Sequence, residues 1–245
     1  MLDLPGHGRS RPWPPPWTLR AVGEAIEGAL HPAVEGTPLP PLRWVAGHSF
    51  GGKSALQWLA TTRHPPEHLF VLDANPGSRP DRRGAEGLMY VMSTLRRHAA
   101  VRYPTRSAFE ALVRSEGILP AIASWLATNL EPAEGGGFVL SLNLDLIEAL
   151  LDDHFRVDLW PLLECPPEPT IVHLVVGGRS RVLDEEDVQR AERLAARSPR
   201  VRLHCIPEAG HWLHVEALEP LVYTLSSAMA AATSPLPPDS ASRMQ

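Results

Sequence analysis

Short, mostly apolar runs recur along the chain and predict buried strands. The runs are four to six residues long and carry few charges, which suits strands in the interior of a domain. They occupy residues 42–46, 69–72, 171–176 and 201–206. The second run leads directly into Asp73, so an acid is expected at the tip of that strand.

Apolar residues that recur every three or four positions predict helices. One stripe follows the first run and another lies near the amino terminus; their members are Ala55, Leu56, Leu59 and Ala60, and Leu19, Val22, Ile26 and Leu30. Residues 78–155 carry further stripes without strand-like alternation, so they are interpreted as a helical insert. Most apolar residues of these stripes are expected to pack in a core. Residues 134–137, Glu-Gly-Gly-Gly, are interpreted as a flexible break within the insert.

An octapeptide after the first run carries two catalytic motifs at once. Residues 47–54 read Gly-His-Ser-Phe-Gly-Gly-Lys-Ser. Residues 47–51 satisfy G-x-S-x-G, the nucleophile elbow, in which glycines at both ends allow a sharp turn that presents Ser49. The whole octapeptide also satisfies G-x-x-x-x-G-K-S, a phosphate-binding loop in which Lys53 would reach the phosphates of a nucleotide. Since both motifs lie between a strand and a helix, the octapeptide alone leaves a serine hydrolase and an NTPase open.

Two other segments favour the hydrolase. Asp73 fits either interpretation, because it could lie near the magnesium ion of an NTPase or serve as the acid of a hydrolase triad. Residues 2–10, Leu-Asp-Leu-Pro-Gly-His-Gly-Arg-Ser, resemble the D-x-P-G-x-G-x-S turn that follows the fourth strand of α/β-hydrolases. Residues 207–212, Pro-Glu-Ala-Gly-His-Trp, resemble the G-H-W turn that carries their catalytic histidine, here His211. The order Ser49, Asp73, His211 is also the order of that superfamily. The chain is therefore identified by resemblance as an α/β-hydrolase.

More narrowly, the chain resembles small bacterial esterases with a G-H-S-M-G-G-K elbow, related to a mitochondrial hydrolase. In that subgroup Gly-Lys naturally follows the elbow, which explains the phosphate-loop match. The resemblance runs from residue 2 to about residue 230 and implies an α/β-hydrolase fold: a mostly parallel sheet flanked by helices, with a helical cap inserted between the sixth and seventh strands. The expected hydrolase core has two parts, residues 1–77 and 156–232. The cap is expected at residues 78–155 and a disordered tail at residues 233–245.

The triad acid departs from the usual pattern. Most α/β-hydrolases carry it in a G-x-x-D turn after the seventh strand, but the corresponding turn here, residues 177–180, ends in Ser180. The resembled esterases share this serine and place an aspartate after the sixth strand, where this chain has Asp73. Asp184 is the alternative acid. Residues 184–187 are all acidic and open a predicted helix, where they would cap free amides and oppose the dipole, so Asp73 is preferred.

The amino terminus is a second departure from the resembled fold. Members of the fold have about three strands and a helix before the D-x-P-G turn, whereas residues 1–4 would already lie in the fourth strand. The strand before Ser49 would then have a bare edge, and the loop that normally donates one oxyanion-hole amide would be absent. We therefore expect a chain whose first strands are missing, truncated at the amino terminus, and poorly soluble and inactive by itself.

The resemblance implies hydrolysis of a carboxylic ester, or of a thioester, through an acyl-enzyme intermediate. Ser49 would attack the carbonyl, and His211 would act as general base and then general acid. Asp73 would orient the histidine, and the amide of Phe50 would stabilise the oxyanion. This chemistry needs no metal and no organic cofactor. Two alternatives stay open: a non-catalytic remnant of the fold and, more remotely, a P-loop NTPase.

Other polar residues near these motifs are given structural roles. His48, beside the nucleophile, is expected to shape the pocket. His214 is expected to make local packing or hydrogen-bonding contacts. Lys53, in a hydrolase, is expected at the surface or just behind the site.

Composition limits the classes of binding partner and the cellular compartment that we expect. With 245 residues and 44% hydrophobic content the chain can bury one sizeable core, and its net charge of −5 argues against nucleic-acid binding. It contains no run of about 18 apolar residues and no recognisable signal peptide. We therefore expect a cytoplasmic protein, without a membrane span, that acts on a small-molecule acyl ester. Cys165 and Cys205 suggest no disulfide framework, no spacing suggests a zinc site, and the oligomeric state is left open.

Overall fold

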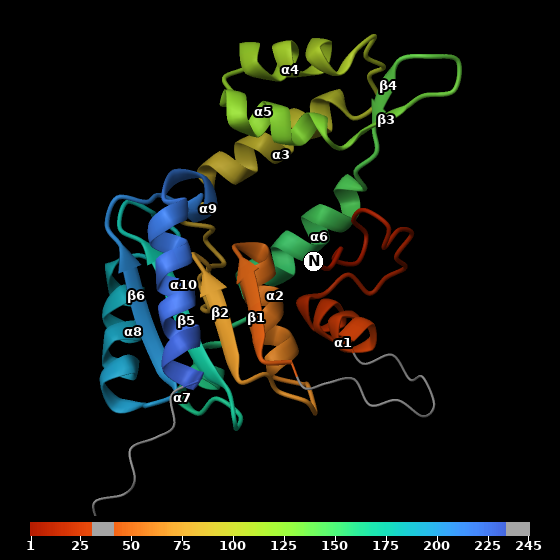
Figure 1. The fold of residues 1–245 in the computed structure, drawn as a ribbon. Helices are drawn as coiled ribbons and strands as arrows, with labels where there is room; N and C mark the ends of the chain where they lie inside the picture. The colour runs from red at the N-terminus through yellow and green to blue at the C-terminus, as the bar shows by residue number, and fades with distance from the viewer. Residues whose placement is uncertain (31–41, 234–245) are drawn as a thin grey trace, which may run out of the picture. The chain divides into compact units, whose positions relative to one another are not determined.

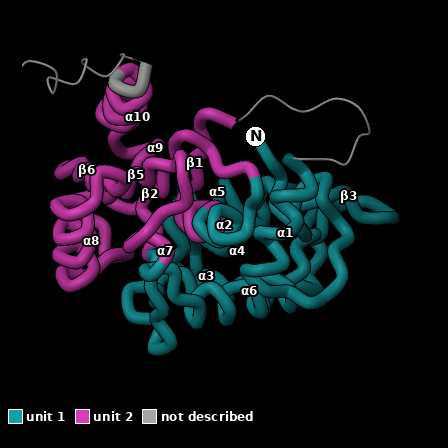
Figure 2. Tube along the Cα trace, turned by 90° about the horizontal axis from the view of Figure 1, so that it is seen from below, with its two compact units in different colours: residues 1–40, 56–63, 76–161 teal, residues 41–55, 64–75, 162–245 magenta. Residues whose placement is uncertain are grey.

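The computed structural model describes residues 1–30 and 42–233, which fall into two compact units (Figure 2). Unit 1 comprises residues 1–40, 56–63 and 76–161, and unit 2 comprises residues 41–55, 64–75 and 162–245. Residues 234–245 of the predicted tail lie outside the described residues. The division into core and cap expected from the sequence stays a prediction.

The described part of unit 2 is built on a parallel sheet with strand order β1-β2-β5-β6 (Figure 1). The strands are β1 (Trp44–His48), β2 (His68–Leu72), β5 (Ile171–Gly177) and β6 (Val201–Ile206). The strands predicted from the apolar runs are thereby confirmed, with β1 shifted two residues toward the carboxyl terminus. Because His48 pairs with Leu72, Ser49 and Asp73, the next residues, lie at the same edge of the sheet.

One face of this sheet packs against α10 (Leu218–Thr233). Phe70, Val175 and Ile206, from three neighbouring strands, form a buried cluster with Leu213 and Leu221. Burying an apolar side chain of this size contributes about 1.5–3 kcal/mol, so the cluster fixes the strands whose ends carry the site. The other helices that lie wholly or partly in unit 2 are α2 (Phe50–Leu59), α7 (Trp160–Glu164), α8 (Glu185–Arg197) and α9 (Leu213–Glu216).

Three histidines form a hydrogen-bonded row across β2, β5 and β6. Nε2 of His173 lies 2.9 Å from Nδ1 of His68, and Nδ1 of His173 lies 3.0 Å from Nε2 of His204. Burial, with the adjacent His204 and His68, lowers the pKa of His173 to about 3. His173 is therefore neutral near pH 7, and the row supplies its own hydrogen bonds within the sheet.

Unit 1 is mainly helical. Its helices are α1 (Leu19–Leu30), α3 (Glu86–His98), α4 (Arg106–Ser115), α5 (Pro120–Ala127) and α6 (Leu144–Arg156). The predicted stripes are confirmed in part: Leu95, Phe109 and Leu126 are almost fully buried, whereas Leu88, Leu119 and Trp125 are exposed. The expectation of an insert without strands is wrong, because β3 (Leu130–Pro132) and β4 (Phe138–Leu140) form an antiparallel hairpin. Gly135–Gly137, all at positive φ, make its turn rather than a flexible break.

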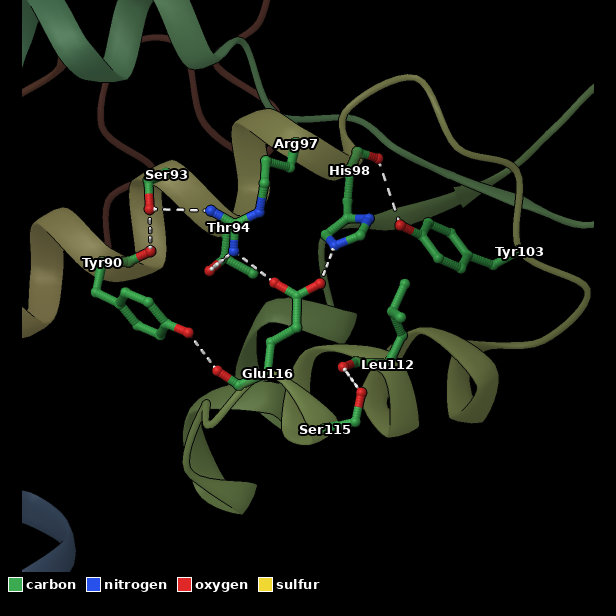
Figure 3. Close-up of polar contacts among 9 residues, drawn as sticks. All are labelled: Tyr90, Ser93, Thr94, Arg97, His98, Tyr103, Leu112, Ser115 and Glu116. Atoms are coloured by element: carbon green, nitrogen blue, oxygen red, sulfur yellow. Dashed lines mark hydrogen bonds and ion pairs between the residues drawn. The ribbon is translucent and has the colours of Figure 1, made fainter.

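The carboxylate of Glu116 joins the ends of two helices in unit 1 (Figure 3). It accepts hydrogen bonds of 2.5 Å from Nη2 of Arg97 and from Nε2 of His98, both in the last turn of α3, while Glu116 follows α4. The hydroxyl of Tyr90 donates to the backbone carbonyl of Glu116. Hydrogen bonds from Arg97 and then His98 lower the pKa of Glu116, so the carboxylate is charged and ties α3 to α4.

Residues 1–4 are not in a strand, so the expectation that they begin inside one is wrong. The chain here turns back on itself: the amide of Arg9 donates to a carboxylate oxygen of Asp3 at 3.1 Å, and the hydroxyl of Ser10 donates to the Asp3 carbonyl at 2.9 Å. Gly6 and Gly8 adopt φ of 79° and 50°, which glycine tolerates best. These bonds engage the carbonyl and the side chain of Asp3, and the expected D-x-P-G segment is a turn.

Candidate active site

Ser49 stands on a sharp turn between β1 and α2. Its φ is 55°, in the left-handed region that few residues other than glycine adopt. Its amide donates to the carbonyl of Leu72 at the end of β2 (2.9 Å), and its carbonyl accepts from the amide of Gly52 (2.9 Å). A serine held in a strained turn between a strand and a helix is the geometry of a nucleophile elbow.

Two glycines make this turn sterically possible, and only one of them is a position expected from the motif. A Cβ at Gly47 would lie 2.3 Å from the carbonyl oxygen of Gly51. A Cβ at Gly52 would lie 2.9 Å from the Cβ of Ala74, whereas a Cβ at Gly51 would meet no atom within 4 Å. The first turn of α2 therefore approaches its neighbours most closely at Gly52, so the steric demand falls there rather than on Gly51.

Asp73 lies at the tip of β2 and its carboxylate is fully buried. Its φ of 45° is also in the left-handed region. The carboxylate accepts the amide of Gly177 on Oδ1 (3.0 Å), and the hydroxyl of Ser180 (2.5 Å) and Nδ1 of His211 (2.7 Å) on Oδ2. A buried carboxylate needs such donors in place of water, and here they come from the last residue of β5 and from the loops after β5 and β6.

The contact with Asp73 determines the tautomer of His211. A carboxylate only accepts, so Nδ1 of His211 carries a proton, and Nε2 of the neutral ring is left as an acceptor. An acceptor in this position can take the proton of a serine hydroxyl. No hydrogen bond joins His211 to Ser49 among the described residues; catalytic hydrogen bonds of this kind often form only in the substrate complex. The structure thus brings Asp73 and His211 together.

His48 ties the elbow to the loop that carries His211. Its Nε2 donates to the backbone carbonyl of His211 at 2.7 Å, and the two ring centroids lie 4.7 Å apart. Burial lowers the pKa of His48, partly opposed by this hydrogen bond, so the ring is neutral near pH 7. Sequence reasoning assigned His48 to the pocket but missed this contact, because its partner lies 163 residues away.

The alternative acid, Asp184, serves the start of α8. Its carboxylate accepts the amide of Asp187 at 3.0 Å, and the carboxylate of Asp187 accepts the amide of Asp184 at 3.2 Å. This reciprocal pair is a capping box. The capping role expected for Asp184 is therefore confirmed.

Phe50 and Lys53 both lie in α2, the helix that follows the elbow. Phe50 begins α2, so its amide belongs to the helix turn whose dipole attracts negative charge. Lys53 is only 1% exposed, so of its two expected places the surface is wrong, and the place just behind the site is the one compatible with its burial. Its amide bonds the carbonyl of Ser49 at 3.2 Å, and from this position in α2 its side chain enters the interior.

The described residues hold no metal-ligand cluster. Within residues 1–30 and 42–233, no group of three or more His, Cys, Asp or Glu side chains is arranged to bind a metal ion. None of the helices in that part of the chain is long and apolar enough to cross a bilayer. Cys165 and Cys205 are exposed free thiols.

Comparison with known proteins gives a family match and several relatives. A family model described as "Alpha/beta hydrolase family" matches residues 1–222. The mouse (Mus musculus) protein named sn-1-specific diacylglycerol lipase ABHD11 is 26% identical over 235 residues, which cover 94% of this chain and 70% of that protein. Esterase YbfF of Escherichia coli (strain K12) is 24% identical over 170 residues, which cover 69% of this chain and 60% of that protein.

Solved structures share the fold at lower identity. A structure titled "Marine microorganism esterase" superimposes with a TM-score of 0.71 at 22% identity, covering 93% of this chain and 82% of that chain. The structure of E-2-(acetamidomethylene)succinate hydrolase gives a TM-score of 0.69 at 17% identity, covering 93% and 80%. These structures establish a shared fold.

Proposed function

Because the chain belongs to the alpha/beta hydrolase family, we propose that it is a serine hydrolase that cleaves a carboxylic ester, or a thioester, of a small molecule. The observation that carries this proposal is the pairing of two features at neighbouring strand ends of unit 2. Ser49 sits in a left-handed turn at φ 55°, and the buried Asp73 holds Nδ1 of His211 at 2.7 Å. The names of two relatives, a lipase and an esterase, support an ester as substrate.

In the proposed mechanism, Nε2 of His211 accepts the proton of the Ser49 hydroxyl as the oxygen attacks the ester carbonyl. The tetrahedral intermediate carries its negative charge on the former carbonyl oxygen, and the amide of Phe50 at the start of α2 donates to it. His211 then gives the proton to the leaving alcohol, which leaves an acyl group on Ser49. Water attacks this acyl-enzyme with His211 again as base, and the acid product departs.

Asp73 has two tasks in this mechanism. Its hydrogen bond holds the His211 ring in the tautomer that exposes Nε2, and its charge stabilises the imidazolium that forms in each half-reaction. Burial strengthens the second effect, because little water competes with the ring for the carboxylate. Asp184, engaged in capping α8, is assigned no part in it.

The phosphate-loop interpretation of residues 47–54 finds less support. A lysine in such a loop has to extend toward nucleotide phosphates, yet the side chain of Lys53 is 1% exposed. The left-handed conformation of Ser49 is the one that the elbow requires.

The test of the proposed function is hydrolysis of p-nitrophenyl esters of increasing acyl length, and of matching thioesters, by the wild-type protein and by Ser49→Ala. On every ester or thioester that the wild-type protein cleaves, we expect Ser49→Ala to lose about 10⁴-fold or more in kcat. Equal turnover by the two proteins would refute the proposal. Absence of turnover on every ester and thioester would favour a non-catalytic member of the family.

A further inference from the structure

We propose that Ser180 is a positioning residue for Asp73, and that its hydroxyl sets how strongly the buried carboxylate acts on His211. This inference rests on the proposed function only for its kinetic consequence; the contact itself belongs to the fold of unit 2. The hydroxyl of Ser180 donates to Oδ2 of Asp73 at 2.5 Å. That oxygen is the one that accepts Nδ1 of His211 at 2.7 Å.

The proton of the Ser180 hydroxyl has a defined direction. The amide of Val182 donates to Oγ of Ser180 at 3.2 Å, which occupies a lone pair of the hydroxyl oxygen. A serine hydroxyl has one proton to donate, and the carboxylate of Asp73 is the acceptor placed to receive it. Since Asp73 is 0% exposed, its carboxylate depends on protein donors such as this hydroxyl.

The loop that carries Ser180 is held against the loop that carries His211. The amide of Arg179 donates to the carbonyl of Ala209 at 2.9 Å, and the amide of Ser180 donates to the carbonyl of Gly177 at 3.0 Å. A Cβ on Gly177 would lie 2.4 Å from the carbonyl oxygen of Gly210. The backbone therefore fixes position 180 relative to the histidine loop, so its side chain can work as a fixed donor.

A neutral donor on Oδ2 changes what the carboxylate does for the histidine. Each hydrogen bond to a carboxylate oxygen draws charge from it, so the hydroxyl of Ser180 weakens the attraction between Asp73 and a protonated His211. It also restricts rotation of the carboxylate, because Gly177 holds the other oxygen at 3.0 Å. Without Ser180, the protonated ring would be favoured at higher pH and would release its proton less readily.

The test compares Ser180→Ala with Ser180→Thr, which keeps a hydroxyl, and with Ser198→Ala as the matched control. Ser198 is also partly buried, and its hydroxyl oxygen accepts a hydrogen bond from the amide of Arg200, two residues further on, at 3.2 Å. Its loop, however, leads into the opposite end of β6.

The first readout is the NMR titration of the His211 ring, whose signal is assigned with His211→Asn. The second is the pH profile of kcat/KM on a p-nitrophenyl ester, with active enzyme counted by fluorophosphonate titration.

We expect the pH midpoint of the His211 titration, and with it the acidic limb of kcat/KM, to move up by about half a unit in Ser180→Ala. We expect kcat to fall about tenfold, with the wild-type behaviour largely restored in Ser180→Thr and retained in Ser198→Ala. The titratable side chains near His211 in unit 2, namely Asp73, His48, His214 and Glu216, are the same in all variants.

An unmoved midpoint in Ser180→Ala would overturn the inference, whatever the rate. If Ser180→Ala does not fold, Ser180→Cys, whose thiol is a weak donor, is measured in the same way, and an unmoved midpoint there has the same meaning. The NMR readout does not depend on turnover. Failure of the proposed function, with no ester cleaved, is therefore distinguishable from failure of this inference.

Discussion

Each unit of the protein holds a carboxylate against a histidine, and the two pairs differ in what surrounds them. In unit 2, Oδ2 of Asp73 lies 2.7 Å from Nδ1 of His211; in unit 1, Oε1 of Glu116 lies 2.5 Å from Nε2 of His98 (Figure 3). The side chain of Asp73 is 0% exposed, whereas that of Glu116 is 25% exposed. Glu116 also binds the guanidinium of Arg97.

The difference shows that a carboxylate–histidine contact does not by itself make a catalytic pair. Glu116 has a permanent cation, Arg97, beside it, so its charge is balanced without a proton on His98. The donors to Asp73 are an amide, a hydroxyl and an imidazole, so a proton on His211 is what would balance its buried charge. The first arrangement joins two helices, and the second suits a base that gains and loses a proton.

The largest expected effect that separates the two pairs comes from removing the charge of Asp73. In Asp73→Asn, the side chain can present its NH₂ group to His211 and favour the wrong tautomer, so we expect kcat to fall by about 10⁴-fold. Asp184→Asn is the matched control, because it changes the capping acid of α8, and it should keep kcat within about threefold of wild type. Kinetics on a p-nitrophenyl ester measure both. A crippled Asp184→Asn beside a nearly normal Asp73→Asn would reverse the assignment of the acid.

A smaller effect is expected from His48, which bonds the backbone of His211 rather than its ring. His48→Phe keeps an aromatic side chain but loses the donor, and we expect kcat to fall about tenfold. His48→Gln, whose amide nitrogen can replace Nε2, should stay within about threefold of wild type. His214→Phe, also beside the ring of His48, controls for changed packing. Equal losses in His48→Phe and His48→Gln would mean that packing, and not the hydrogen bond, matters.

The smallest effect on catalysis is expected at Glu116. Glu116→Gln should leave kcat unchanged and lower the Tm by at most about 3 °C. Because the pKa of Glu116 is lowered in the folded protein, its contribution is present at neutral pH and is lost as the pH falls through that lowered value. The Tm difference from wild type should therefore vanish in acid. Glu24→Gln, which alters an exposed pair with Arg20, is the control. A large loss of kcat in Glu116→Gln would contradict the purely structural role given to the pair in unit 1.

Much of this architecture could be predicted from the sequence, because it depends on local patterns. The α/β-hydrolase fold class is confirmed by the family match and by the shared fold of solved structures. Short apolar runs marked the strands, and the elbow motif placed Ser49 at a strand end, where the structure has it. Asp73 was likewise expected at the tip of its strand, because β2 ends in an apolar run.

The sequence could not show how loops far apart in the chain meet. The bond from Ser180 to Asp73 spans 107 residues and that from His48 to His211 spans 163, and no local pattern encodes either. The burial of Lys53 depends on what surrounds α2. The hairpin of β3 and β4 did leave a signal, the three consecutive glycines of its turn, but strands of three residues are too short for a period to be recognised.

The most direct test of the central claim, that Ser49 is a nucleophile activated by His211 and Asp73, is covalent labelling with a fluorophosphonate probe followed by peptide mass mapping. We predict a single adduct on the peptide that contains Ser49, no adduct in Ser49→Ala, and labelling slowed by orders of magnitude in His211→Ala and Asp73→Asn but not in Asp184→Asn. Labelling of Ser49→Ala at the wild-type rate, or an adduct on another residue, would contradict the claim.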